Sequence, residues 1–175
     1  MGMNAIQLLK DDHKKVKELL GDLVNTTARA DKKRQQLLEK IEQELKIHTQ
    51  IEEEIFYPAF KQAGNSEHVR MYYEALEEHR AVEELVLPDL MKTGRGSQNF
   101  SGRAKVLKEL VEHHLQEEKK EMFKKAQKAM TKEQLNELGV RMSERKQALL
   151  KQMSAGASGK RPSKKMPPCA LLARS

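Results

Sequence analysis

Histidine and glutamate occur in this sequence at spacings that suit metal binding. His48 and Glu52 are four residues apart, and so are His114 and Glu118. This spacing places both side chains of a pair on one face of an α-helix, one turn apart. An imidazole nitrogen and a carboxylate oxygen offered together favour iron, manganese or zinc over copper(I) or magnesium. The two pairs therefore indicate metal sites on two helices.

Two more histidines, His13 and His79, lie like these pairs within apolar stripes of helical period. A stripe position faces the core, where an imidazole or carboxylate without a partner is costly. A metal ion would compensate both kinds of group. The sequence therefore predicts one buried set of ligands: His13, His48, Glu52, His79, His114 and Glu118. That set exceeds the four ligands of a structural zinc, so two metal ions with open or water-filled positions are expected.

Five amphipathic helices are expected from the periodicity and from capping residues. They run from Asn4 to about Asn25, from Asp31 to a stop at Pro58 and Gly64, from Asn65 or Ser66 to a loop at Thr93–Ser101, from Ser101 to near Met130, and from Thr131 to near Met153. Pro88 is expected to kink or fray the end of the third helix.

Short loops between the first four helices predict an up-down-up-down arrangement. His48 stands about fifteen residues before the turn near Gly64 and His79 about fifteen after it, so the two lie at one height. The same reasoning brings the histidines of all four helices into one layer. The predicted fold class is all-α: a four-helix bundle with an additional C-terminal helix over residues 1–153, followed by a disordered basic tail over 154–175.

The charge distribution and the cysteine content indicate which partners and which cellular location to expect. Five of the seven net positive charges lie in the tail, which leaves about +2 for the helical part. We therefore expect no specific nucleic-acid partner. Cys169 is the single cysteine, and neither a secretory signal nor a run of ~20 apolar residues is present, so we expect a cytoplasmic protein with no membrane partner. A monomer or weak homo-oligomer is expected.

The sequence resembles the hemerythrin-like proteins of the HHE cation-binding type. The matching stretches are Asp12-His13, HTQIEEEIFYP at 48–58, EEHRAVEEL at 77–85 and HHLQEEKKEMF at 113–123, and the likeness spans roughly residues 5 to 150. The resemblance implies a hemerythrin-like four-helix bundle with a non-haem di-iron site that binds dioxygen, nitric oxide or peroxide. Carried over by position, it assigns the same six residues as ligands.

The sequence differs from the oxygen-carrying members of that family on the third helix. There it has Glu83 one turn after His79, where those proteins have a second histidine. Glu83 is therefore a supplementary or outer ligand. The fourth helix offers adjacent candidates of each kind; its apolar stripe favours His114, and leaves His113 and Glu117 as supplementary.

Two classes of function follow. The first is a protein that binds or senses dioxygen, nitric oxide or iron at a di-iron centre. The second is an enzyme in which the same centre removes hydrogen peroxide, as a catalase does, or reduces nitric oxide; Glu83 favours this reading because it could leave an open iron position. No catalytic residue is assigned. Manganese or zinc remain alternatives to iron, and a scaffold that uses metal only to hold the fold is a third reading.

Ferritin-like di-iron proteins need Glu-x-x-His pairs, and no histidine here has a glutamate three residues before it. The remaining polar residues are expected to lie at the surface or to pack, and not to bind metal. His68 precedes the third stripe and is expected at the surface. Tyr57, Tyr72 and Tyr73 are expected to pack at the bundle ends, or to donate a hydrogen bond near the site. A solvated charged face is expected for Glu53, Glu54, Glu77, Glu78, Lys119 and Lys120.

Overall fold

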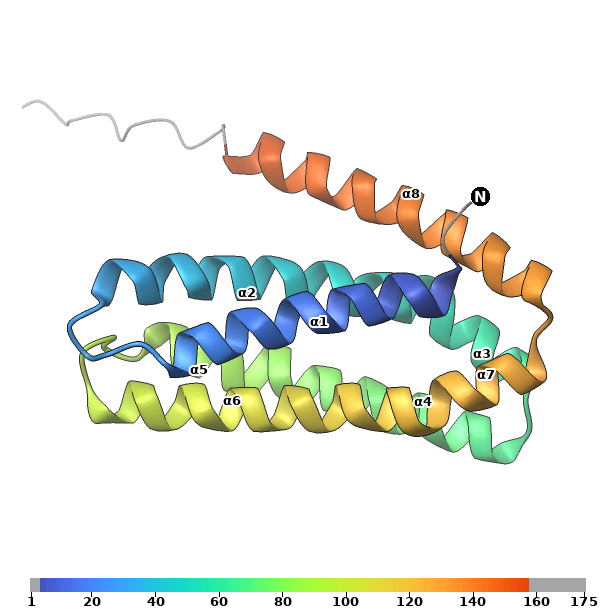
Figure 1. The fold of residues 1–175 in the computed structure, drawn as a ribbon, viewed down its shortest axis with the longest axis horizontal. Coiled ribbons are helices and arrows are strands. Elements are labelled where there is room, and N and C mark those ends of the chain that lie inside the picture. The colour runs from blue at the N-terminus through green and yellow to red at the C-terminus, as the bar shows by residue number, and fades with distance from the viewer. Residues whose placement is uncertain (1–3, 158–175) are drawn as a thin grey trace, which may run out of the picture.

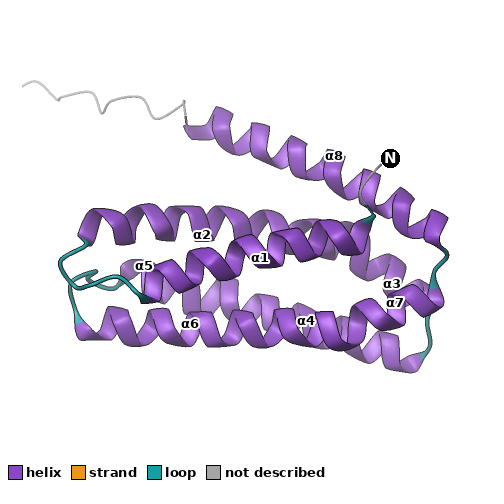
Figure 2. Ribbon diagram, in the orientation of Figure 1, coloured by secondary structure: helices purple, strands orange, loops and turns teal. Residues whose placement is uncertain are grey.

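A computed structural model describes residues 4–157 of the chain. Those residues form helices joined by short loops and contain no strand (Figure 2). The helices are α1 (Ala5–Val24), α2 (Asp31–Ile51), α3 (Tyr57–Ala63), α4 (Ser66–Arg80), α5 (Leu87–Lys92), α6 (Gln98–Glu117), α7 (Phe123–Ala129) and α8 (Lys132–Ala157), with π-helical segments η1 (Glu52–Phe56), η2 (Ala81–Val86) and η3 (Glu118–Met122). No helix in the described part is long and apolar enough to cross a membrane.

The helices form four antiparallel columns, and the predicted bundle topology is correct. The columns are α1, α2–η1–α3, α4–η2–α5 and α6–η3–α7, and α8 packs across the outer side of α1 and α2 (Figure 1). The π segments lie within the columns and do not break them.

Capping side chains set two of the predicted boundaries. The Asn4 side chain accepts a hydrogen bond of 3.0 Å from the Gln7 backbone N–H and begins α1. Thr131 and Gln134 cap each other's backbone N–H at the start of α8, with hydrogen bonds of 2.8 and 3.2 Å. This reciprocal pair is a capping box, as the sequence predicted.

Two helix ends differ from the prediction. The fourth column begins at Gln98 and not at Ser101, because the Ser97 hydroxyl accepts a hydrogen bond from the Phe100 backbone N–H and caps the helix earlier. The last helix continues beyond Met153 to Ala157. The rest of the predicted tail lies outside the described residues.

The π segments were not predicted, and they explain how the helices pass Pro58 and Pro88. In η1 the Tyr57 backbone N–H bonds to the Glu52 carbonyl, and in η2 the Leu87 N–H bonds to the Val82 carbonyl, each five residues back. The proline follows directly in both, and the wider turn lets the helix continue through a residue with no N–H. Of the expected stop at Pro58 and Gly64, the helix therefore passes Pro58 and ends before Gly64.

The third π segment has the same register without a proline. In η3 the Phe123 N–H bonds to the Glu118 carbonyl, and Lys124 stands where the other two have proline. Proline is therefore not required for the wide turn. All three segments lie at the height of the predicted ligands, which is where π segments are often found in proteins.

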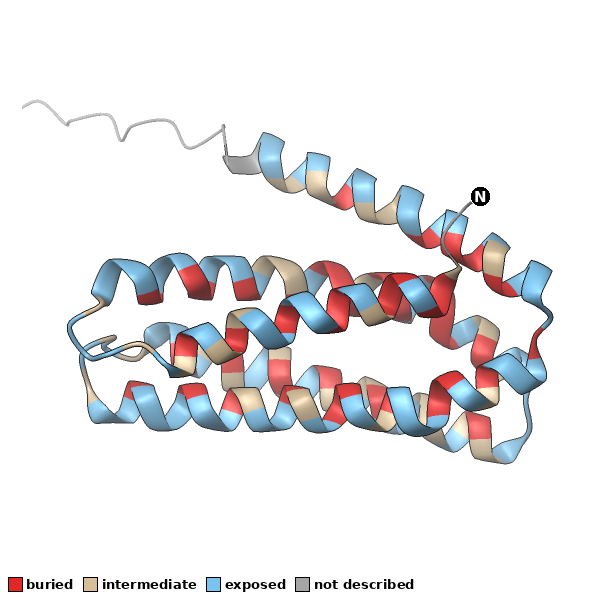
Figure 3. Cartoon of the chain, in the orientation of Figure 1, coloured by how far each residue is buried: buried red, intermediate tan, exposed pale blue. Residues whose placement is uncertain are grey.

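The apolar core is divided into two clusters. One cluster contains Phe56, Phe60 and Phe123 and extends to the inner face of α8, and the other is built around Leu20, Ile41 and similar side chains toward the opposite end. The predicted metal ligands fall between these clusters along every column, among the buried positions that line the bundle in Figure 3. The bundle therefore holds a layer of polar groups between two apolar halves.

Candidate metal centre

All six predicted ligands are buried and come from the four columns of the bundle. Their ligand atoms form two groups, each with all atoms within 4.8 Å of one another. The first group is His13, His48, Glu52 and Glu118, and the second is Glu52, His79 and His114. Glu52 belongs to both groups, so its two oxygens are placed to bridge two cations.

The first group consists of buried atoms that lack hydrogen-bond partners. His13 Nε2 lies 3.1 Å from Glu118 Oε2, and His48 Nε2 lies 3.3 Å from Glu52 Oε1, but neither pair is aligned as a hydrogen bond. Buried polar atoms are rarely left in this state. Two imidazole nitrogens and two carboxylate oxygens that converge without hydrogen bonds between them fit a divalent cation of the iron, manganese or zinc kind.

The second group offers three ligand atoms. His79 Nε2 lies 3.4 Å from Glu52 Oε2 and 3.0 Å from His114 Nε2. Glu118 Oε2 lies 3.6 Å from His114 Nε2, at the boundary between the groups. A cation here would have fewer protein ligands than one in the first group, so positions would remain for another molecule.

Tyr57 lies inside the site, a role that the sequence left open. Its hydroxyl donates a hydrogen bond of 2.9 Å to Glu118 Oε1 and lies 3.2 Å from His79 Nε2. Burial, and then the negative charges of Glu118 and Glu52, raise the pKa of Tyr57 well above its usual value. The hydroxyl therefore keeps its proton and remains a hydrogen-bond donor.

Two surface carboxylates orient the imidazoles of the second group. Glu53 Oε1 accepts a hydrogen bond of 2.8 Å from His79 Nδ1, and Glu78 Oε2 accepts one of 2.6 Å from His114 Nδ1. A protonated Nδ1 leaves Nε2 free to face the centre, which is the usual arrangement of a metal-binding histidine. Both glutamates were expected mainly on the solvated charged face; they lie at the surface and in addition bond to these two imidazoles.

His48 has an outer carboxylate of its own. Asp12 Oδ2 lies 3.8 Å from His48 Nδ1, and Lys146 of α8 donates a hydrogen bond to Asp12 Oδ1. Burial raises the pKa of Asp12, but His48 and Lys146 outweigh it and the pKa lies below its usual value. Asp12 is therefore a negative charge between a ligand and the additional helix.

The two shared carboxylates differ in their affinity for protons. Burial, and then the charge of Glu118, raises the pKa of Glu52 well above its usual value. Burial acts in the same direction on Glu118, but the positive charges of His114 and His13 outweigh it and lower its pKa. Burial lowers the pKa of His48 to about 4, so this imidazole is neutral and able to bind metal at neutral pH.

The supplementary candidates lie outside both groups. Glu83 accepts a hydrogen bond from the Thr49 hydroxyl. His113 and Glu117 are at the surface, where they form a third, more exposed group with Glu78. The structure thus separates His114 from its neighbour His113, as the apolar stripe indicated.

His68 is buried, contrary to its predicted surface position. Its Nδ1 accepts a hydrogen bond of 3.3 Å from the Asn65 backbone N–H, and its ring lies 4.6 Å from that of Phe60. His68 takes part in the cap of α4, where its ring lies against Gly64, and it belongs to neither group of predicted ligands.

Comparisons with known proteins agree with this geometry. A search among curated proteins found no match. Among solved structures, the chain is similar to a hemerythrin HHE cation binding domain-containing protein from Mycobacterium kansasii, with a TM-score of 0.78 and 26% identity over 90% of this chain and 94% of the other. The sequence model of the hemerythrin HHE cation binding domain matches residues 4–126. The match covers most of the sequence, including all six predicted ligands, and the protein therefore belongs to the hemerythrin HHE cation-binding family.

Proposed function

We propose that this protein holds two non-haem iron ions and binds or senses a small molecule there, dioxygen or nitric oxide, or iron itself. The observation that carries the proposal is the pair of buried groups joined by Glu52. His13, His48 and Glu118 complete the first position, and His79 and His114 the second. The imidazoles and carboxylates suit iron, manganese or zinc, and the likeness to hemerythrin-like proteins favours iron among these. The single cysteine, which has no partner in the chain, fits a cytoplasmic protein.

A small cavity beside the second group supports a ligand of one or two heavy atoms. It has a volume of about 20 Å³ and lies against His79 and His114, with Leu45, Val82 and Val111 among its walls. A cavity of this size has room for about one water molecule. It would admit dioxygen, nitric oxide or peroxide and exclude larger substrates.

Iron bound at this centre would supply electrons to such a ligand in single steps. The protein's own residues supply the surroundings. The apolar walls keep bulk water from the cavity, and Glu53 and Glu78 hold the two imidazoles in place. Tyr57 keeps a proton on its hydroxyl next to Glu118, where it can share a hydrogen bond with the carboxylate.

The alternative is an enzyme that removes hydrogen peroxide or reduces nitric oxide. It is favoured by the three-ligand group, because Glu83 bonds to Thr49 and adds no ligand there. An open metal position next to a protonated Tyr57 suits turnover as well as reversible binding.

Metal content and visible absorption of aerobically purified protein test the proposal. We expect about two iron ions per chain and a ferric absorption spectrum that changes when peroxide is added. His79→Ala should lose iron, whereas His113→Ala, which removes an exposed imidazole, should retain it. Absence of bound iron, together with no uptake of ferrous iron under anaerobic conditions, would contradict the proposal.

Peroxide consumption separates the two candidates. Catalytic loss of peroxide that disappears in His79→Ala and persists in His113→Ala would establish the enzyme. Stoichiometric binding without turnover would leave the binding protein as the answer.

A further inference from the structure

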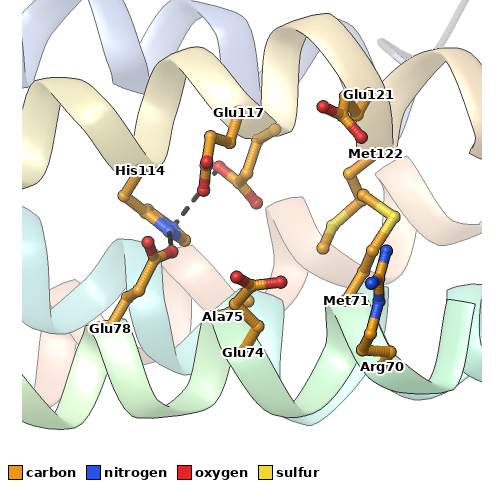
Figure 4. A pocket seen from close by; sticks show the side chains of 10 residues that line it. Arg70, Met71, Glu74, Ala75, Glu78, His114, Glu117, Glu121 and Met122 are labelled. Carbon is orange, nitrogen blue, oxygen red and sulfur yellow. Dashed lines mark hydrogen bonds and ion pairs between the residues drawn. The ribbon is translucent and has the colours of Figure 1, made fainter. Parts of the chain in front are cut away.

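An acidic pocket leads from the surface toward the buried ligands. It has a volume of about 230 Å³ and opens between α4 and the α6–η3 column. Figure 4 shows Glu74 and Glu78 reaching into this space from α4, and Glu117 reaching toward them from α6. Glu121 stands further along the same wall, and Arg70 is the one basic residue in the lining. Carboxylates therefore dominate the charge of the pocket.

The inner end of the pocket is formed by two of the ligands. His114 and Glu118 both belong to its lining. Glu118 is only 2% exposed, and its Oε2 has no hydrogen-bond partner in the described structure. A buried acceptor without a partner thus lies at the end of a negatively charged pocket, an arrangement that calls for a cation.

Two of the lining glutamates, Glu78 and Glu117, also belong to a more exposed group that is able to bind a cation first, together with His113 beside the pocket. Ligand atoms of Glu78, His113 and Glu117 lie within 4.8 Å of one another, and His113 Nε2 is 3.2 Å from Glu117 Oε1. The His113 side chain is 66% exposed, so it can meet ions from solution. An imidazole with two carboxylates prefers first-row transition metals to magnesium or calcium.

We propose that this pocket is the route by which divalent transition-metal ions reach the buried centre, with Glu78, His113 and Glu117 as the first docking site. The inference rests on the proposed function, because it supplies the metal for that site. Glu78 links the two ends, since it belongs to the docking group and also bonds to His114 Nδ1. A cation that draws Glu78 outward would release His114 to turn toward the incoming ion.

The arrangement separates metal from the small ligand. The acidic pocket attracts cations and repels anions, whereas the small cavity that also touches His114 has mainly apolar walls and admits uncharged molecules.

The test is the rate at which metal-free protein takes up Co²⁺, followed by the visible absorption of Co²⁺ in stopped flow. Glu117→Gln with Glu121→Gln should load about tenfold more slowly than the unaltered protein, since the attracting field is weakened. His113→Gln should also slow loading. The final amount of bound Co²⁺ and its spectrum should stay the same, because the buried ligands are untouched.

A matched control removes two carboxylates from the same column, at positions of α6 that lie outside the pocket. Glu109→Gln with Glu112→Gln makes the same change in net charge, and both residues pair with lysines on the surface of α6. This variant should load at the unaltered rate. At about 1 M salt, where charges are screened beyond roughly 3 Å, the pocket variant should approach the control.

Equal loading rates for the pocket variant and the control would overturn this inference and leave the proposed function intact. Failure of the unaltered protein to bind Co²⁺ would overturn both. Circular dichroism and thermal unfolding should confirm that all variants fold alike, as expected for changes at the surface.

Discussion

Lys146, on the last helix, donates a hydrogen bond to Asp12, on the first, and the same carboxylate faces the imidazole of His48. A chain of three side chains therefore runs from the bundle-facing side of α8 to a predicted ligand. The family match ends at residue 126, so Lys146 lies beyond the matched domain. Electrostatic contacts as well as apolar packing thus link the additional helix to the layer of predicted ligands.

Lys146→Met should weaken metal binding. Loss of an outer partner of a metal-binding histidine typically costs about 10- to 100-fold in affinity, and Lys146 is one step further away, so we expect about threefold to tenfold. Competition with a chelator for Zn²⁺ measures the change. Lys151→Met, at an exposed position of the same helix, is the control. Equal affinities for the two variants would mean that α8 does not influence the centre.

Tyr57→Phe should destabilise the metal-free protein. The substitution keeps the ring but removes the donor to Glu118 Oε1, which leaves a buried carboxylate oxygen without a partner. Such a loss costs about 1–3 kcal/mol. Urea unfolding of the metal-free protein measures it, with Tyr73→Phe as the control because the Tyr73 side chain is exposed. Equal stability of the two variants would show that the Glu118–Tyr57 hydrogen bond contributes nothing.

Metal affinity should increase with pH. The raised pKa of Glu52 means that it keeps a proton at pH values where an exposed glutamate is already ionised. A metal ion held by Glu52 must displace this proton, so affinity should keep rising with pH above the range in which an exposed glutamate ionises. His48, with a pKa of about 4, is neutral above that range and does not compete.

Calorimetric titration with Zn²⁺ in two buffers of different ionisation enthalpy measures the protons released. Glu83→Gln changes a carboxylate outside both groups and should preserve the pH dependence. An affinity that does not vary with pH would contradict the assignment of Glu52 as a protonated bridge.

Gly64→Ala should lower stability because of His68. A Cβ at Gly64 would lie 2.0 Å from His68 Cγ, so the ring that closes the cap of α4 must move. Overpacking of this kind costs about 1–3 kcal/mol. Gly102→Ala is the opposite case: nothing lies within 4 Å and the residue is inside α6, so stability should rise by about 0.5–1 kcal/mol. Thermal unfolding of both variants checks the two signs, and a stable Gly64→Ala would show that His68 moves freely.

The sequence was sufficient to predict the bundle and the convergence of the six predicted ligands in one buried layer. Apolar stripes with a 3.6-residue period report which face of a helix is buried, and an ionisable residue on such a stripe is conspicuous. This reasoning distinguished His114, which is buried, from its neighbour in the chain His113, which is exposed. Short loops then fixed the heights at which the histidines meet.

The outer partners could not be predicted in the same way. Glu53 and Glu78 lie at the border between the buried and exposed faces of their helices. Their roles depend on which imidazole of a neighbouring column comes within hydrogen-bond distance. The Asp12–Lys146 contact depends on how α8 crosses the bundle, which no local pattern encodes. His68 was misplaced because its burial results from a cap hydrogen bond and not from periodicity.

The π segment η1 has a consequence for how the protein could lose its function. Glu52 and Tyr57 are five residues apart, and in a regular α-helix their side chains would point about 140° apart. The wide turn of η1 brings them together, with the Tyr57 hydroxyl 3.4 Å from Glu52 Oε2. Straightening η1 into a regular α-helix with the sequence unchanged would therefore turn the tyrosine away from the centre, although the change would be nearly invisible in a measurement of helix content. Deleting one residue between Glu52 and Tyr57 would instead leave them four residues apart, about 40° apart in an ordinary helix, and keep both on the inner face.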